Sequence, residues 1–177
     1  MGKIMAEPRP HGKPLAGPPG RGVTFRPRIP PTNGFAMPGT IDARLKELGI
    51  EIPAAAAPAA NYVPYAISGK LVFIAGQITN KDGKPQYIGK VGREFGVEEG
   101  QAAARLCALN ILAQLKDACG GDLDKVARCV RLGGFVNAPP EFGDQPKVIN
   151  GASDLIVQVF GDKGKHARAA EIGRAHV

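Results

Sequence analysis

The clearest chemical candidate in the 177-residue chain is a single arginine near its end. Arg168 follows the short basic segment Lys163-Gly164-Lys165-His166. A guanidinium stays charged at any working pH, and its planar fork can bind a carboxylate through two parallel hydrogen bonds. Taken alone, the segment is more typical of a solvated basic tail. The sequence shows no ordered Ser, His and Asp arrangement that would predict nucleophilic catalysis.

Residues that could bind a metal or a cofactor are too scattered to predict a site. The chain has neither a Cys-x-x-Cys pair nor a P-loop, and no Gly-x-Gly-x-x-Gly follows a predicted strand. Free cysteines behave as small buried hydrophobes, so a structural, reduced role is expected for them. We therefore expect no metal and no cofactor. The residues considered were His11, His166, His176, Cys107, Cys119 and Cys129.

Composition places the chain among ordinary globular proteins. Hydrophobic residues make up 44% and charged residues 22% of the sequence, which is typical of one domain with a possible tail. No stretch approaches the ~20 apolar residues that span a bilayer. No apolar run follows the basic residues at the N-terminus, and three cysteines make no disulfide framework. The expected location is the reducing cytoplasm.

Residues 1–38 differ from the rest of the chain. They hold 9 of the 16 prolines and a charge of +5 out of the total of +7. Such a segment buries too little apolar area to fold, so we predict a disordered basic tail. It could touch RNA weakly, serve as a passive extension, or reflect a start codon assigned too early, with Met37 nearer the natural start. The remaining residues carry only +2, a weak electrostatic footprint for nucleic acid.

Periodicity predicts a domain over residues 39–170. A short helix should begin with Thr40 as N-cap and stop at Gly49. The following order of strand, strand, possible strand, helix, strand and helix predicts a mixed β-sheet with two helices on one face, an α/β (α+β) fold. The predicted elements are strands 62–68, 71–75, 86–91 and 126–136, and helices 98–118 and 146–160.

Three details of these elements carry further expectations. The continuous apolar strand 71–75 predicts burial on both faces, by helices on one side and a partner on the other. Gly133 and Gly134 interrupt a predicted strand and indicate a bulge or a close-packing point. In helix 98–118 the apolar stripe at helical spacing comprises Ala104, Cys107, Ile111 and Leu115.

Five sequence segments resemble the RidA/YjgF family, also called endoribonuclease L-PSP-like. They read NYVP at 61–64, GKLVFIAGQ at 69–77, EGQAAAR at 99–105, GFVN at 134–137 and QPKVINGAS at 145–153. The resemblance covers about residues 40–170. It implies a chorismate-mutase-like fold and a homotrimer with inward-facing sheets and ligand clefts between subunits. Well-studied members hydrolyse reactive enamine or imine intermediates to 2-keto acids and ammonia.

The resemblance also implies binding residues, although no catalytic residue is carried over. Arg168 matches the family arginine that pairs with the substrate carboxylate. Tyr62 matches a tyrosine near the cleft, with a core-edge packing role as the alternative. Gly76 and Gln77 end the second predicted strand, where family backbone groups approach the cleft. Asn150 matches a helix position that faces the cleft, with capping or packing as the alternative.

Three functions remain open at this point. The first is a deaminase of the 2-iminobutanoate/2-iminopropanoate type, acting on small imino or enamino acids. The second is a non-catalytic trimer that binds small metabolites or has a regulatory role. The third is an endoribonuclease, which the nearly neutral body disfavours. No membrane or nucleic-acid partner is expected.

The end of the chain departs from the resemblance. Members of this branch continue beyond the arginine with their last strands, which carry an acidic residue proposed to activate water. Here residues 171–177 show no strand periodicity, and they can be encoded by a string that resembles a sequencing-adapter oligonucleotide. We therefore predict that residues 171–177 are foreign, that the domain lacks its final strands and that its activity is impaired. Resequencing the locus from an independent library tests this prediction.

Overall fold

The structure is a computed structural model that describes residues 39–57 and 60–173. All of them belong to one compact unit, Phe35–Val177. The tail predicted over residues 1–38 and positions 174–177 lie outside the described residues. The elements, with η for a short 3-10 helix, are α1 (Thr40–Glu47), β1 (Tyr65–Ser68), β2 (Leu71–Ile74), β3 (Asn80–Lys81), β4 (Lys84–Pro85), α2 (Val97–Ala118), η1 (Leu123–Lys125), β5 (Arg131–Val136), α3 (Gln145–Phe160), η2 (Gly161–Gly164) and β6 (Ala167–Ile172).

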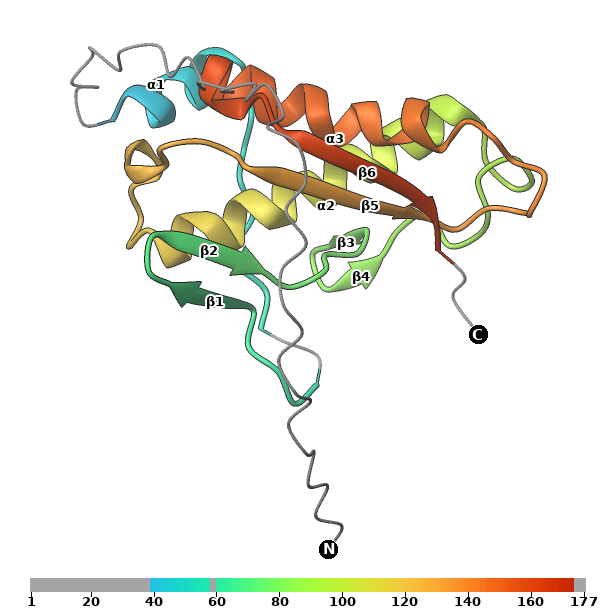
Figure 1. Cartoon of the computed structure of the whole chain (residues 1–177), viewed down its shortest axis with the longest axis horizontal. Helices are drawn as coiled ribbons and strands as arrows, with labels where there is room; N and C mark the ends of the chain where they lie inside the picture. Colours follow the sequence, from blue (N-terminus) through green and yellow to red (C-terminus); the bar gives the residue numbers. More distant parts are fainter. Residues whose placement is uncertain (1–38, 58–59, 174–177) are drawn as a thin grey trace, which may run out of the picture. The chain divides into compact units, whose positions relative to one another are not determined.

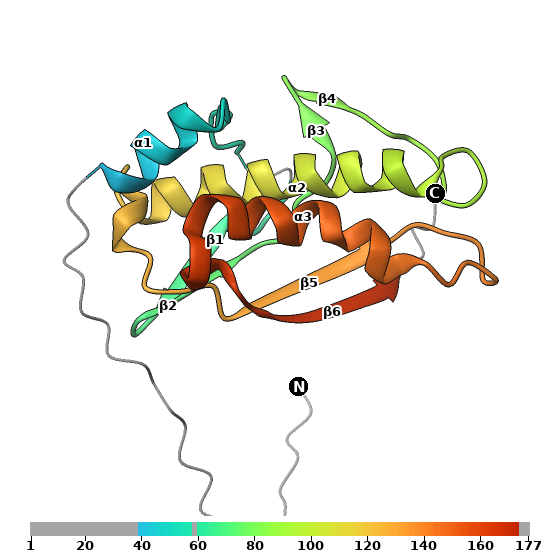
Figure 2. The same cartoon turned by 90° about the horizontal axis from the view of Figure 1, so that it is seen from above.

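Helices α2 and α3 pack side by side on one face of the strands (Figure 1). Seen from above, α2 and α3 form one layer, and β1, β2, β5 and β6 lie beneath them (Figure 2). β1 pairs with β2 antiparallel, whereas β5 pairs with β6 parallel. This arrangement confirms the predicted α/β (α+β) fold with helices on one face, although the described strands form three two-stranded sheets rather than one mixed sheet. The described part of the chain contains no helix that is both long and apolar enough to cross a membrane.

Small residues let α2 and α3 approach closely. The buried row on α2 recurs every four residues and comprises Gly100, Ala104, Ala108 and Leu112. On the facing helix, a Cβ at Gly151 would collide with the backbone carbonyl of Gln101. The predicted apolar stripe of α2 is confirmed only in part: Ala104 is buried, Ile111 and Leu115 pack against the core from its edge, and the fully buried positions are Ala108 and Leu112. Cys107, Ile111 and Leu115 are only half-buried.

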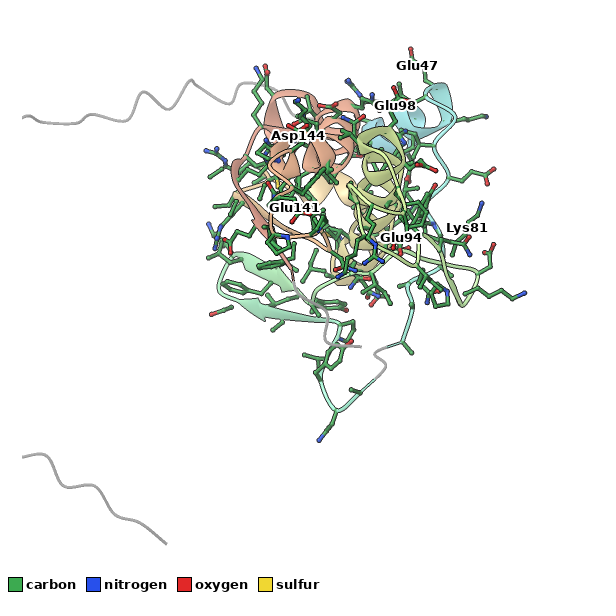
Figure 3. The ribbon with its side chains drawn as sticks, turned by 90° about the vertical axis from the view of Figure 1, so that its right-hand side faces the viewer. Glu47, Lys81, Glu94, Glu98, Glu141 and Asp144 are labelled. Atoms are coloured by element: carbon green, nitrogen blue, oxygen red, sulfur yellow. The ribbon has the colours of Figure 1, made fainter. Side chains whose placement is uncertain are left out.

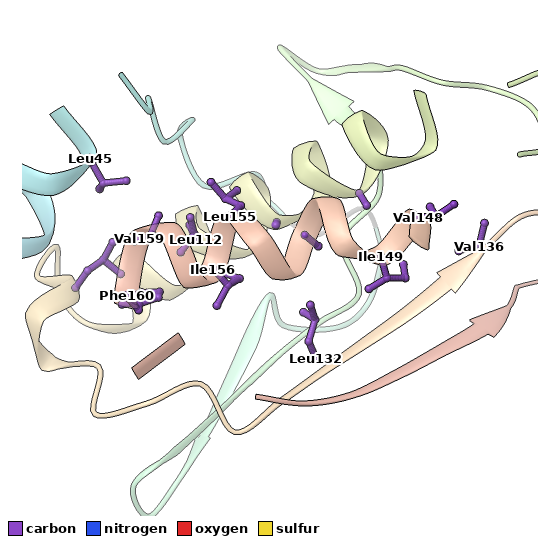
Figure 4. Close-up of a cluster of buried hydrophobic side chains, with 14 of the residues drawn as sticks. Leu45, Leu112, Leu132, Val136, Val148, Ile149, Leu155, Ile156, Val159 and Phe160 are labelled. Atoms are coloured by element: carbon purple, nitrogen blue, oxygen red, sulfur yellow. The ribbon is translucent and has the colours of Figure 1, made fainter. Parts of the chain in front are cut away.

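The hydrophobic core lies between the helices and β5 (Figure 4). Every apolar position predicted on one face of α3 is buried, and Leu155 and Val159 are fully shielded from solvent. Burial of such a side chain stabilises the fold by roughly 1.5–3 kcal/mol. Charged side chains such as Glu47 and Lys81 point away from the body (Figure 3). The other predicted members of this face are Val148, Ala152 and Ile156.

A distant carboxylate anchors the start of α1. Asp124 accepts hydrogen bonds from the backbone N–H groups of Gly39, Thr40 and Ile41 at 2.6, 2.9 and 3.1 Å. A negative charge at a helix N-terminus also interacts favourably with the helix dipole. The N-cap is Gly39 rather than the predicted Thr40, because Asp124 supplies the acceptor that a local side chain would otherwise provide. The predicted stop at Gly49 is confirmed by its left-handed φ of 63°.

Three predicted strands are shorter than expected or absent. β1 begins at Tyr65 and β5 at Arg131, so the leading residues of both predicted strands lie outside the ladders. No strand occupies residues 86–91, because Tyr87 adopts a positive φ of 52° that breaks an extended chain. The residues just before them form the β3–β4 hairpin, whose Asp-Gly turn has two positive φ angles, as a type I′ turn requires.

Gly134 is a close-packing point rather than a bulge. The β5–β6 register runs without interruption from Arg131↔Ala167 to Val136↔Ile172. A Cβ at Gly134 would collide with the Ile149 side chain of α3, whereas a Cβ at Gly133 would meet open space. Of the two predicted alternatives, the structure therefore supports close packing.

The last described element, β6, is a strand that periodicity did not predict. β6 pairs with β5 along its whole length, and Gly173 N donates to Val136 O beyond it. Because Glu171 and Ile172 belong to β6, the expectation that no strand enters residues 171–177 is wrong for these two positions. The long-range parallel pairing supplies the order that the local sequence lacks. The foreign origin of these residues stays a prediction.

Candidate functional site

Arg168 lies where β6 faces α3. It stands opposite Leu132 in the β5–β6 register, and Leu132 is buried beneath α3. Since side chains alternate across a strand, Arg168 points to the same side. Asn150 and Ser153 lie one turn apart on α3 and so share a helix face. Arg168 Nη1 donates to Asn150 Oδ1 at 2.7 Å and to Ser153 Oγ at 3.2 Å.

These two bonds leave one edge of the guanidinium unused. Nη1 of Arg168 carries two hydrogens, and both are taken by Asn150 and Ser153. Within residues 39–57 and 60–173, Nε and Nη2 have no hydrogen-bond partner, and the residue is exposed. The Nε–Nη2 edge is one of the faces through which arginine binds a carboxylate in bidentate fashion. The geometry is therefore that of a preorganised anion receptor.

A histidine extends the cluster on the side of Ser153. His166 Nε2 lies 3.1 Å from Ser153 Oγ, and Nδ1 lies 2.6 Å from the carbonyl oxygen of Gly164. Gly164 is buried against the α3 backbone, where a Cβ would meet the carbonyl oxygen of Ile156 at 2.5 Å. Nothing in the sequence indicated this contact, because Ser153 lies on α3 and His166 in the link between η2 and β6, 13 residues away.

The site carries positive charge without a neighbouring acid. Lys165 is engaged by Asp162 at 2.8 Å, and the hydrogen bond from Lys165 holds the pKa of that carboxyl below its usual range. Glu171, three residues after Arg168, occupies an odd position of β6 and so faces away from α3. In the part of the chain that is described, no Asp or Glu bonds to Arg168, Ser153 or His166.

The other sequence-predicted residues lie on the β1–β2 hairpin and its flanks. Tyr62 precedes β1 and is 50% exposed. Gly76 follows β2 and is exposed, while Gln77 Nε2 donates to the carbonyl of Ala75 at 3.0 Å. The structure thus joins Arg168 to Asn150, but no hydrogen bond between described residues joins it to Tyr62, Gly76 or Gln77.

A separate cavity of about 690 Å³ lies away from these residues. It is bounded by α1, the segment that follows α1, and α2, and none of the predicted site residues lines it. The Lys116–Asp42 ion pair, 2.9 Å long, belongs to its wall. Within the described ranges, no group of three or more His, Cys, Asp or Glu side chains could hold a metal ion.

Comparison with known proteins agrees with this fold. The family described as "YjgF/chorismate_mutase-like, putative endoribonuclease" matches residues 42–173. Protein TCP17 of Trypanosoma cruzi is 50% identical over 133 residues, which cover 75% of this chain and 82% of that protein.

Two solved structures are also similar. Protein Atu1372 of Agrobacterium tumefaciens, described as of unknown function, has a TM-score of 0.70 at 50% identity and covers 77% of this chain and 84% of its own. A putative endoribonuclease of Shewanella oneidensis has a TM-score of 0.73 at 40% identity, over 76% of this chain and 88% of its own.

Proposed function

Because the chain belongs to the YjgF/chorismate mutase-like family, we propose that it is a hydrolytic deaminase of small reactive imines and enamines that carry a carboxylate. Water adds to the C=N carbon, and the resulting carbinolamine collapses to a 2-keto acid with release of ammonia. Arg168 holds the carboxylate and thereby fixes the orientation of the neighbouring C=N bond, which is how binding groups accelerate such additions.

One observation carries the proposal. Asn150 and Ser153 hold Nη1 of Arg168, and the Nε–Nη2 edge has no partner among the described residues. An exposed guanidinium with one edge fixed and the other open is suited to a planar carboxylate. No Asp or Glu among the described residues bonds to Arg168 and so occupies this edge.

We propose that the active unit is a homotrimer whose clefts form between subunits. The strand faces turned away from the helices expose Leu71, Phe73 and Phe135, which are 49%, 58% and 72% exposed. Apolar side chains gathered on one face favour a protein interface. An intersubunit cleft would also bring Tyr62, Gly76 and Gln77 of one copy towards Arg168 of another.

A second candidate is binding of small carboxylates without hydrolysis. It is favoured by one observation: no described Asp or Glu bonds to the Arg168 cluster, so no acid is placed to activate water. Endoribonuclease activity, which the family description and the Shewanella oneidensis relative mention, is not our proposal. The charge beyond residue 38 is only +2, which gives RNA little electrostatic attraction.

A coupled assay separates the two candidates. Threonine dehydratase generates the unstable imine from threonine, and release of 2-oxobutanoate is followed with and without this protein. Binding of 2-oxobutanoate, the product, is measured in parallel by calorimetry. The deaminase predicts faster release, and Arg168→Ala should lower kcat/KM about 10- to 100-fold, the effect of losing a charged hydrogen-bond pair.

Matched variants sharpen the assay. Arg168→Lys keeps the charge but loses the fork, so an intermediate loss is expected. Arg93→Ala removes an exposed arginine whose partner is Glu94 and should leave release unchanged. Binding of 2-oxobutanoate that depends on Arg168, without faster release, would select the binding-only candidate. Neither binding nor acceleration by the wild-type protein would reject both.

A further inference from the structure

We propose that Ser153 and His166 are positioning residues that orient Arg168 for side-on binding of a carboxylate. This inference rests on the proposed function and deepens it. The two residues belong to a series of hydrogen bonds that runs from Gly164 O through His166 and Ser153 to Arg168 Nη1. Neither residue was a sequence-predicted site residue.

The donor-to-acceptor direction of these hydrogen bonds is fixed at Gly164. The Gly164 carbonyl can only accept a hydrogen bond, so His166 Nδ1, 2.6 Å away, carries the proton. In the neutral imidazole, Nε2 is then the acceptor. Ser153 lies 3.1 Å from Nε2 and donates its hydroxyl hydrogen there. The glycine therefore selects the tautomer of the histidine.

The direction matters for Arg168. A hydroxyl has one hydrogen and two acceptor lone pairs. If Ser153 aimed its hydrogen at Nη1 of Arg168, two donors would face each other across 3.2 Å. Because His166 takes that hydrogen, a lone pair of Ser153 faces Nη1 instead. His166 thus acts on Arg168 through Ser153, without touching the guanidinium.

The backbone that carries these hydrogen-bonded residues is closely packed. Gly164 packs against the backbone of Ile156, and α3 is fixed against α2 through Gly151 and Gln101. Arginine has many rotamers, and a side chain that is held before binding loses less conformational freedom when the ligand arrives. Two bonds on Nη1 restrict rotation of the guanidinium and present its Nε–Nη2 edge to the solvent.

The test observes the guanidinium itself. Side-chain ¹⁵N resonances of Arg168, assigned by their loss in Arg168→Lys, report rotation about the Cζ–Nη1 bond. We expect Ser153→Ala and His166→Asn to speed this rotation, because each removes a hydrogen bond that Ser153 makes. His166→Gln should preserve the slow rotation, since its longer amide reaches Ser153 and can accept the hydroxyl hydrogen. Asp154→Asn, an exposed neighbour on α3, is the control.

Binding of 2-oxobutanoate is measured on the same variants. Loss of one hydrogen bond to a charged group predicts about tenfold weaker binding for Ser153→Ala and His166→Asn. His166→Gln should stay within about threefold of the wild type. Thermal unfolding confirms that each variant is folded, so that a general loss of structure is recognised.

The outcomes separate the inference from the proposed function. If the wild type neither binds 2-oxobutanoate nor accelerates its release, the proposed function fails, and the resonances of Arg168 still decide whether Ser153 and His166 position it. Unchanged rotation in folded Ser153→Ala and His166→Asn would overturn the inference even where binding and hydrolysis are intact. Equally weakened binding of 2-oxobutanoate in His166→Asn and His166→Gln would also overturn the inference.

Discussion

The β5–β6 pair and the β1–β2 hairpin both lie under a helix, yet α3 buries the inward side of β5 far more completely than α2 buries the inward side of β2. The inward residues Leu132 and Val136 of β5 are buried. The corresponding residues of β2, Val72 and Ile74, are only half-buried. The candidate site follows the same division, because its hydrogen-bonded cluster belongs to α3 and β6. The difference indicates that the half around α3 and β5 has its inward face covered within a single chain, whereas the half that holds the hairpin needs a further surface against it.

The largest expected effect contrasts two leucines. Leu155→Ala empties a fully buried position and should lower the free energy of unfolding by about 2–5 kcal/mol. Leu71→Ala removes a half-exposed side chain of the hairpin and should cost only ~0.5 kcal/mol in the monomer. Urea unfolding at low protein concentration measures both. Similar decreases in the free energy of unfolding for the two variants would mean that the two halves are equally well packed.

Adjacent glycines of β5 give a smaller, internally matched contrast. Gly134→Ala drives a methyl group into Ile149, so a loss of about 1–3 kcal/mol is expected from overpacking. Gly133→Ala points into open space and should leave the unfolding midpoint nearly unchanged. Thermal or urea unfolding of the two variants provides the comparison. If Gly133→Ala lowers the free energy of unfolding as much as Gly134→Ala does, backbone conformation rather than contact with α3 would explain the loss of stability.

A charged residue on the hairpin tests whether another surface packs against it. Phe73→Asp places a carboxylate on the exposed face of β2 and should leave the monomer nearly as stable as before, because the side chain is already 58% exposed. If copies of the chain cover this face, the same substitution should dissociate the assembly, since burial of an unpaired charge is unfavourable. Analytical ultracentrifugation reads the mass directly. An unaltered oligomer would place the contact elsewhere.

The smallest effect concerns thiol chemistry on α2, the helix that contacts both halves. Burial raises the pKa of Cys107 to about 11, so at pH 8 only about one thiol in a thousand is ionised. Labelling of Cys107 by a thiol reagent should therefore be slow at pH 8 and accelerate as the pH rises towards 11. Mass spectrometry after timed labelling resolves each cysteine. Rapid labelling of Cys107 at pH 8 would mean that α2 is less well covered than described.

The helices could be predicted because their signals are local. α3 shows apolar residues at helical spacing with Pro146 in its first turn and Gly161 after its last. β6 could not be predicted in this way, because ARAAEI is rich in alanine and charge, and its order comes from pairing with β5 across the chain. The apolar stripe on α2 was predicted only in part, because Ile111 and Leu115 lie at the edge of the core while Ala108 and Leu112 are fully buried.

The site was predictable only in part. Arg168 and Asn150 came from the family resemblance, and the structure joins them directly. Ser153 offered a usable signal, because it lies three residues after Asn150 and so forms a polar pair on one face of the helix. His166 offered none, since its role depends on how η2 turns the chain back towards α3.

Glycines surround α3 from three directions, at Gly134 on β5, at Gly164 after the helix and at its own Gly151 facing α2. Each of these contacts leaves no room for even one added methyl group. Attempts to reshape the site for bulkier ligands by moving α3 would therefore meet steric resistance on every side. Redesign of ligand size has to act through the exposed positions on the Arg168 face of β6, while the helix itself serves as a fixed reference.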